Sequence, residues 1–408
     1  MADFNIDAAA ERRMGAFFDQ IGDVLHNKRR RASFAMYALG LLGDGERKSA
    51  EPIAARACGD PVQCDAYHQR LLHFIADSVW SDHHVRRAAT RYAIAAMVER
   101  EPITSWLVDD TGFLKQGKHS VGVQRQYTGS AGKTTNCQIG VSLSVATRTE
   151  HLGLDFELYL PRPWVEDVAR RTEAKIPAEI VFKTKPELAL DMMSRAVAEG
   201  VPPGVVLADS AYGDSSAFRL GLRQQGLDYA VGIHGTTKVW RVDKLLRRAG
   251  PALSARDLAL AIGRKGFRRC TWREGTKEPL WSRFALRRVV PAHDDGTDPA
   301  HREDVWLLME WPDGEKEPPK YFLATLPCGS TRKQIVRVVK ERYRTERLYE
   351  DLKGELGLDH FEGRSFAGWH HHISVALCCY AFVLSERVRR FPPSARWSLA
   401  DDALPLAA

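Results

Sequence analysis

The sequence lacks the features of a membrane or secreted protein. It contains no run of 18 apolar residues, which is about the shortest stretch that spans a bilayer as a helix. Residues 1–18 carry acids where a signal peptide needs a basic start and a long apolar core. We therefore expect a cytoplasmic protein with no membrane association.

The sequence also lacks the patterns of several ligand sites. Its seven cysteines are odd in number and scattered, and no C-x-x-C pair occurs, so neither a disulfide framework nor a zinc site is expected. The stretch "GSAGKTT" resembles a phosphate-binding loop, but Tyr127 stands where that motif needs its first glycine. Nucleotide binding is therefore not expected.

Positive charge is present, and it is concentrated. The chain has 408 residues, 44% of them hydrophobic, and a net charge of +7, which is typical of a globular protein with two or three domains. Residues 238–288 alone hold 15 lysines and arginines against 4 aspartates and glutamates. Such a block indicates a phosphate-backbone partner, or else a basic surface that is merely solvated.

The hydrophobic periodicity changes along the chain. Residues 1–100 carry apolar residues at helical spacing. Beyond them, the pattern predicts three strands of an antiparallel meander, a helix, and two further strands separated by a helix that Asp214 or Ser215 caps. The strands are expected at 105–110, 136–147, 151–161, 205–208 and 227–233, and the first helix at 185–200.

A different composition follows. Residues 235–322 hold most of the basic block, several tryptophans and short alternating runs, which predicts a mainly β insertion. Ser330 is a good N-cap for a long helix over 331–358, and a last helix is expected over 365–390.

Two of the predicted strands end in acidic residues. Asp109 and Asp110 end the strand at 105–110 and would point to opposite sides, because side chains alternate along a strand. Asp209 ends the strand at 205–208. Each is also compatible with a solvated strand end.

The long helix supplies a third acid. A helical projection places Thr345, Leu348 and Leu352 on a buried stripe. The opposite arc holds four charged residues, Arg342, Glu346, Glu350 and Lys353. Such an arc can also be a surface ladder of ion pairs.

These segments together resemble the DDE transposases of bacterial insertion sequences. The resemblance covers about residues 25–390 and rests on the stretches "VDDTGFLKQG", "QYTGSAGKTTNCQIGVSLSVAT", "VLADSAYGD" and "RYRTERLYEDLKGELGLDHFEGRSFAGWHHHISVAL". It implies an α/β fold: an RNase H-like mixed sheet with flanking helices, interrupted by a β insertion before the last Glu. The implied organisation is a helical DNA-binding domain at 1–100, a core at 101–234 and 323–391, the insertion at 235–322 and a loose tail at 392–408.

The resemblance assigns roles to individual residues. The second aspartate of "DDT", Asp110, together with Asp209 and Glu346, would be the catalytic metal ligands. Asp109 would face away and support the strand. Arg342, Glu346 and Lys353 match the spacing of the family's Arg–Glu–Lys signature, although Val339 stands where the family usually has tyrosine.

The same resemblance implies cofactor, partner and activity. Two Mg²⁺ ions, for which Mn²⁺ would substitute, suit three carboxylates and in-line cleavage of a phosphodiester. The partner would be double-stranded DNA, bound by a dimer at the nucleoid. The freed 3′-hydroxyl would then join target DNA. A nuclease without strand joining and a domesticated DNA-binding protein that does not cut are the alternatives.

Other candidates for DNA contacts come from charge alone. They are Lys28, Arg29, Arg30 and Arg31 beside an apolar stretch, and Arg264, Lys265, Arg268 and Arg269 in the insertion. His370, His371 and His372 are consecutive on a predicted helix and cannot all face one metal. We expect them near DNA or in the core. Trp272 and Trp281 suit either base stacking or the core of a small β domain.

Overall fold

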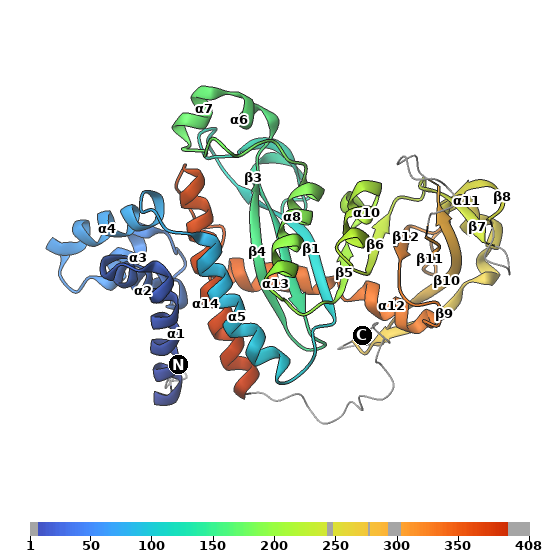
Figure 1. The fold of residues 1–408 in the computed structure, drawn as a ribbon, viewed down its shortest axis with the longest axis horizontal. Coiled ribbons are helices and arrows are strands. Elements are labelled where there is room, and N and C mark those ends of the chain that lie inside the picture. Colours follow the sequence, from blue (N-terminus) through green and yellow to red (C-terminus); the bar gives the residue numbers. More distant parts are fainter. Residues whose placement is uncertain (1–6, 243–247, 276–277, 293–302, 391–408) are drawn as a thin grey trace. The chain divides into compact units, whose positions relative to one another are not determined.

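The computed structural model describes residues 7–242, 248–275, 278–292 and 303–390. The predicted loose tail at 392–408 lies outside these residues, as do Lys244, Arg247 and Lys277 of the basic block. The chain has a mixed α/β fold and forms two compact units (Figure 1). The first contains the residues up to Ile103, Asp110–Met192, and the chain from Thr345 through the last helix; the second contains Thr104–Asp109 and Met193–Arg344.

The first unit begins with the predicted helical segment. Its helices are α1 (Ala8–Leu25), α2 (Lys28–Leu42), α3 (Ala50–Ala57), α4 (Cys64–Ala76) and α5 (Asp82–Val98). Side chains of Asp7, Asn27 and Ser81 accept hydrogen bonds from the first turns of α1, α2 and α5, which satisfies backbone donors that have no partner within the helix. No described helix has the length and apolarity needed to span a bilayer.

The sheet of the first unit follows the predicted meander. It contains β2 (Gln124–Thr128), β3 (Lys133–Ala146), β4 (His151–Tyr159) and the second half of β1 (Ser105–Leu114), whose first half belongs to the second unit. The strand order is β2-β3-β1, with β4 paired antiparallel to β3. One boundary was predicted wrongly. β1 does not end at Asp110 but continues to Leu114, because Thr111 and Phe113 still have buried surroundings. The two acids therefore lie in mid-strand.

Five more described helices belong wholly or mainly to the first unit. They are α6 (Arg162–Glu166), α7 (Val168–Glu173), α8 (Lys185–Ala198), whose last turns belong to the second unit, α13 (Tyr343–Gly354), whose first two residues do, and α14 (Phe366–Arg390). α14 runs alongside α5 (Figure 1) and is buried on nearly all sides. A helix that is buried around its whole circumference can carry apolar residues on every face, which α14 does.

The second unit holds the parallel part of the sheet. β5 (Val205–Ala208) pairs in parallel with β1 and with β6 (Tyr229–Ile233). Between β5 and β6 lie α9 (Ser210–Gly213) and α10 (Ser216–Gln224). Of the two predicted caps, Ser215 is the N-cap of α10. β5 is uniformly buried, as its unbroken apolar sequence predicts for a central parallel strand.

The predicted insertion is mainly β and extends the same sheet. Its elements are β7 (Lys238–Val242), β8 (Arg248–Ser254), α11 (Ala255–Ile262), η2 (Arg264–Gly266), β9 (Arg268–Arg273), β10 (Leu280–Pro291), β11 (Val305–Glu310) and β12 (Lys320–Ala324). β12 pairs antiparallel with β6, and the order continues β12-β11-β10-β7-β8 with β9 on β10. The helix α11 was not predicted.

The long helix predicted over 331–358 is in fact two helices. α12 (Arg332–Lys340) ends before a two-residue turn, and α13 (Tyr343–Gly354) follows. The break lies next to the boundary between the units, so that each helix buries its apolar side within its own unit. Thr331, not Ser330, caps α12, in a capping box with Gln334.

Candidate functional site

The two adjacent aspartates of β1 have different partners. Arg342 Nη1 donates to Asp109 Oδ2 at 2.5 Å, within the second unit. Lys185 Nζ, at the start of α8, donates to Asp110 Oδ2 at 3.0 Å, within the first unit. Both carboxylates are largely buried, with 16% and 17% of their side-chain surface exposed. The prediction that they point to opposite sides is consistent with these separate partners.

The second half of β1 has further contacts. Thr111 Oγ1 lies 3.1 Å from Ser130 Oγ. Lys353 Nζ, on α13, lies 3.3 Å from that same hydroxyl and 5.4 Å from the centre of the Phe113 ring. Lys353 of α13 thus lies beside Phe113, and both Lys353 and Thr111 lie near the Ser130 hydroxyl.

Asp209 directly follows β5 and caps the short helix α9. Its Oδ1 accepts from the Ala211 backbone N–H at 2.9 Å. In the parallel pair of β1 and β5, Ser105 lies opposite Val205 and Leu107 opposite Leu207. The pairing ends there; if the register continued for two more residues, Asp109 would lie opposite Asp209, which follows the end of β5.

Glu346 lies in the first turn of α13 and is exposed. The predicted buried stripe is confirmed, since Thr345, Leu348 and Leu352 have no exposed surface. Among the described residues, the Glu346 carboxylate has no hydrogen-bonding partner. Glu350, one turn further on, is paired with Arg347 at 2.8 Å.

The two cations of the signature differ in position. Arg342 lies in the turn before α13 rather than on that helix, so the helical projection that grouped it with Glu346 was wrong. Lys353 Nζ donates to the Gly112 carbonyl at 2.8 Å. Burial lowers the pKa of Lys353, and Asp359 partly offsets this effect.

The basic residues proposed for DNA contacts also fall into two kinds. Lys28, Arg29, Arg30 and Arg31 form the exposed or half-buried first turn of α2, where Arg31 pairs with Asp23 at 2.8 Å. In the insertion, Lys265, Arg268 and Arg269 are exposed, and the Arg269 guanidinium lies 4.0 Å from the centre of the Trp281 ring. Arg264 is instead paired with Asp313 at 2.5 Å.

The structure shows the burial of the three histidines and two tryptophans for which the sequence allowed either a position near DNA or one in the core. His370, His371 and His372 are all buried in α14, so they belong to the core. Trp272 and Trp281 are half-buried. Trp272 packs edge-on against Phe284, 5.9 Å between ring centres, with Lys340 Nζ 4.4 Å from its ring.

Sequence reasoning missed one group of potential ligands. His83, Asp155 and Glu157 each place one ligand atom within 4.8 Å of the others. The buried Arg86 guanidinium already supplies a positive charge there, since its Nε lies 3.0 Å from Asp155 and its Nη1 lies 2.7 Å from Asp82. The group is therefore explained as an ion-pair network between α5 and β4.

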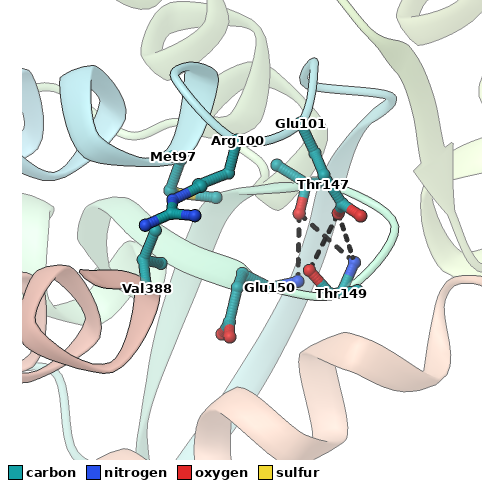
Figure 2. Close-up of a pocket in the computed structure, with 7 residues that line it drawn as sticks. All are labelled: Met97, Arg100, Glu101, Thr147, Thr149, Glu150 and Val388. Carbon is teal, nitrogen blue, oxygen red and sulfur yellow. Dashed lines mark hydrogen bonds between the residues drawn. The ribbon is translucent and has the colours of Figure 1, made fainter. Parts of the chain in front are cut away.

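A small pocket lies elsewhere in the first unit. Its volume is about 10 Å³, room for about one water molecule. Figure 2 shows the Glu101 carboxylate accepting from the Thr149 backbone and hydroxyl within it. The lining residues are Met97, Arg100, Glu101, Thr147, Thr149, Glu150 and Val388, none of which is a predicted site residue.

Two family models and one relative match parts of this chain. The family model described as DDE superfamily endonuclease matches residues 17–279, and the model described as Transposase DDE domain matches residues 184–382. A probable transposase for insertion sequence element IS701 from Microchaete diplosiphon is 30% identical over 202 residues. That match spans 49% of this chain and 48% of the relative.

Proposed function

The chain belongs to the DDE superfamily endonucleases, and from that premise we propose that it is a DNA transposase. It would cleave the ends of a mobile element and join the freed 3′-hydroxyl to target DNA. The name of the relative, a probable transposase, supports this reading. The resemblance of the last motif, from Arg342 to Lys353, supports it as well.

The observation that carries the proposal is the placement of acids on three elements. An aspartate pair lies on β1, Asp209 follows the neighbouring parallel strand β5, and Glu346 lies in the first turn of α13. We propose Asp209 and Glu346 as catalytic residues, together with one aspartate of the β1 pair, for which the sequence motif indicates Asp110.

The donor chemistry of these residues fits Mg²⁺. The ion prefers carboxylate oxygens and keeps several waters, so a few carboxylates suffice to hold it. Within the described part of the chain, the Asp209 side chain accepts a hydrogen bond at Oδ1 as a helix cap, and its Oδ2 would be available to a cation. Two bound ions would activate the attacking water and stabilise the leaving oxygen, and Mn²⁺ would substitute for Mg²⁺.

The nearby cations have two tasks in this proposal. Clustered carboxylates raise one another's pKa unless positive charge offsets the repulsion, and Arg342 supplies such charge at Asp109. Lys353 would hold a phosphate of the DNA end, with Arg268, Arg269 and the first turn of α2 contacting the backbone further away.

A cleavage assay tests the proposal. Linear DNA carrying the flanks of the gene is incubated with the full-length chain and Mg²⁺, and nicks and joined products are separated on a denaturing gel. We expect wild-type protein to produce both, and Asp209→Asn and Glu346→Gln to produce neither while still shifting the DNA in a binding gel. Glu350→Gln, on the same helix, is the matched control and should cleave normally.

Two results would contradict parts of the proposal. Cleavage without joined product, at any target concentration, would identify a nuclease that does not transfer strands. Normal cleavage by Glu346→Gln together with loss in Glu350→Gln would show that α13 presents the other glutamate.

A further inference from the structure

We infer that His234, held in place by Asp214, binds a DNA phosphate next to the one that is cut at Asp209. The inference rests on the proposed function and adds a phosphate-binding side chain to the same site. Two features of the second unit support it. One is an exposed histidine that a carboxylate holds in a fixed orientation, and the other is the close packing between that histidine and Asp209.

The first feature is the way in which His234 is held. Its ring is exposed, with 67% of the side-chain surface accessible, yet its Nδ1 is bonded to Asp214 Oδ2. Asp214 Oδ1 accepts from the His234 backbone N–H and from the Thr237 hydroxyl, each at 2.9 Å. The carboxylate is thus fixed at both oxygens and fixes the ring in turn, as expected for a side chain that is pre-organised for a ligand.

The pairing with Asp214 also determines which ring nitrogen of His234 faces a ligand. A carboxylate can only accept, so Nδ1 donates its hydrogen to Asp214, and Nε2 remains for another partner. A phosphate near Nε2 favours a proton on that nitrogen, because an opposite charge stabilises the charged ring. The protonated Nε2 then donates a hydrogen bond to a phosphate oxygen.

The second feature is the close packing that joins His234 to Asp209. α9 begins directly after Asp209 and ends directly before Asp214. Its backbone lies against the end of β6, where a Cβ on Gly213 would come within 2.0 Å of the Gly232 carbonyl oxygen. A Cβ on Gly232 would in turn lie 3.4 Å from the Asp209 Cα. His234 follows Gly232 by two residues, so the pair of His234 and Asp214 lies beside Asp209.

This position indicates which ligand the histidine meets. In the proposed reaction, Asp209 holds the cation at the phosphate that is cut, so neighbouring phosphates of the same strand pass the adjacent chain segments. Two residues of extended chain span roughly 7 Å, which places His234 near those phosphates. The segment 234–238 contains a lysine and no acid, which suits an anionic ligand.

Paired substitutions in protein and DNA test the contact without relying on cleavage. The full-length chain is titrated, with Ca²⁺ in place of Mg²⁺ to keep the DNA uncut, into fluorescent element-end duplexes that carry one uncharged methylphosphonate near the cut. We expect one such substitution to weaken wild-type binding about fivefold, the order of one charged hydrogen bond. His234→Gln should weaken binding of the natural duplex as much, and that methylphosphonate should then cost less than about twofold more.

The matched control is His119→Gln in the first unit. His119 is also exposed and also paired with a carboxylate, since its Nδ1 lies 3.3 Å from Glu173 Oε1. This variant should bind every duplex as wild type does. If the loss in His234→Gln simply adds to the loss from each methylphosphonate, the inference is overturned, because independent sites give additive effects.

Acylation of histidines in the wild-type chain is a second readout, which needs no variant. Diethylpyrocarbonate acylates accessible histidine nitrogens, and mass spectrometry of the peptides measures the rate at each position. Saturating element-end DNA should slow the acylation of His234 by about fivefold or more and leave that of His119 unchanged. Equal rates for His234 with and without bound DNA would overturn the inference.

The outcomes separate this inference from the proposed function. Wild-type protein that binds and cuts the duplex, together with additive losses in His234→Gln, would overturn the inference alone. Wild-type protein that neither binds nor cuts the duplex would contradict the proposed function, and the inference with it.

Discussion

At the scale of single residues, His372 shows how a buried histidine is kept neutral. The side chain has no exposed surface. Its Nε2 lies 3.0 Å from the Gly357 carbonyl, which can only accept, so Nε2 carries the hydrogen and Nδ1 accepts from the Tyr37 hydroxyl at 2.9 Å. Burial, with the nearby charges of Lys115 and His360, lowers the pKa of His372 to about 4.

This environment predicts a pH dependence of stability. The pKa is lower in the folded chain than the ordinary 6.5, so the contribution of His372 is complete above about pH 6.5 and is lost as the pH falls toward 4. The shift corresponds to on the order of 3 kcal/mol. The free energy of unfolding, measured with urea at pH 7 and at pH 5, should fall less between these pH values for His372→Asn than for wild type. An equal decrease in both proteins would mean that titratable groups other than His372 cause the loss of stability.

At the scale of elements, α11, β9 and β10 carry exposed arginines and arginines that are paired with carboxylates. Arg268 and Arg269 are exposed on β9. Arg283 of β10 is paired with Asp313 at 2.8 Å, and Arg256 of α11 with Glu317 at 2.5 Å. An arginine that already has a carboxylate partner has less to gain from a phosphate, so equal charges in this insertion should differ in their effect on DNA affinity.

Salt dependence should reveal the difference. Each phosphate contact contributes about −0.9 to the slope of log K against log salt concentration, so Arg268→Gln with Arg269→Gln should flatten the slope by up to about 2. The double variant Arg256→Gln with Arg283→Gln removes the same charge and should change it much less. The slopes come from fluorescence anisotropy with labelled element-end DNA. Equal slopes for wild type and both double variants would mean that the β9 arginines are solvated and do not contact DNA.

At the scale of the whole molecule, the proposed reaction needs two DNA ends held together. Each chain has one set of candidate catalytic acids, so a two-fold dimer on DNA is the simplest assembly. In the family resemblance, one chain's site cuts the end that is held mainly by the other. We expect a monomer or weak dimer without DNA, since the sequence contains no long heptad run.

Mixing two inactive variants tests this assembly. One is Glu346→Gln, and the other carries glutamine at Arg29, Arg30, Arg268 and Arg269 to weaken DNA binding. Cleavage restored in the mixture is the expected result. A mixture that stays inactive, while light scattering shows two chains on paired ends, would exclude action in trans.

The sequence by itself determined the types of most elements and supplied the candidate residues of the site. Period-two and period-3.6 patterns gave the strands at 136–147 and 205–208 and the buried stripe of Thr345, Leu348 and Leu352, because each pattern records which side of an element is buried. The resemblance then indicated the family from the order of acids and the spacing from Arg342 to Lys353.

Tertiary structure decided what local patterns do not encode. The helix break after Lys340 lies beside the boundary between two units that each bury an apolar helix face, although residues 331–353 contain no glycine or proline that would interrupt a single helix. The sequence also placed Asp109 and Asp110 on opposite sides without saying what each of them contacts. Only the contacts of Arg342 and Lys185 distinguish them, because these contacts join segments that lie far apart in the sequence.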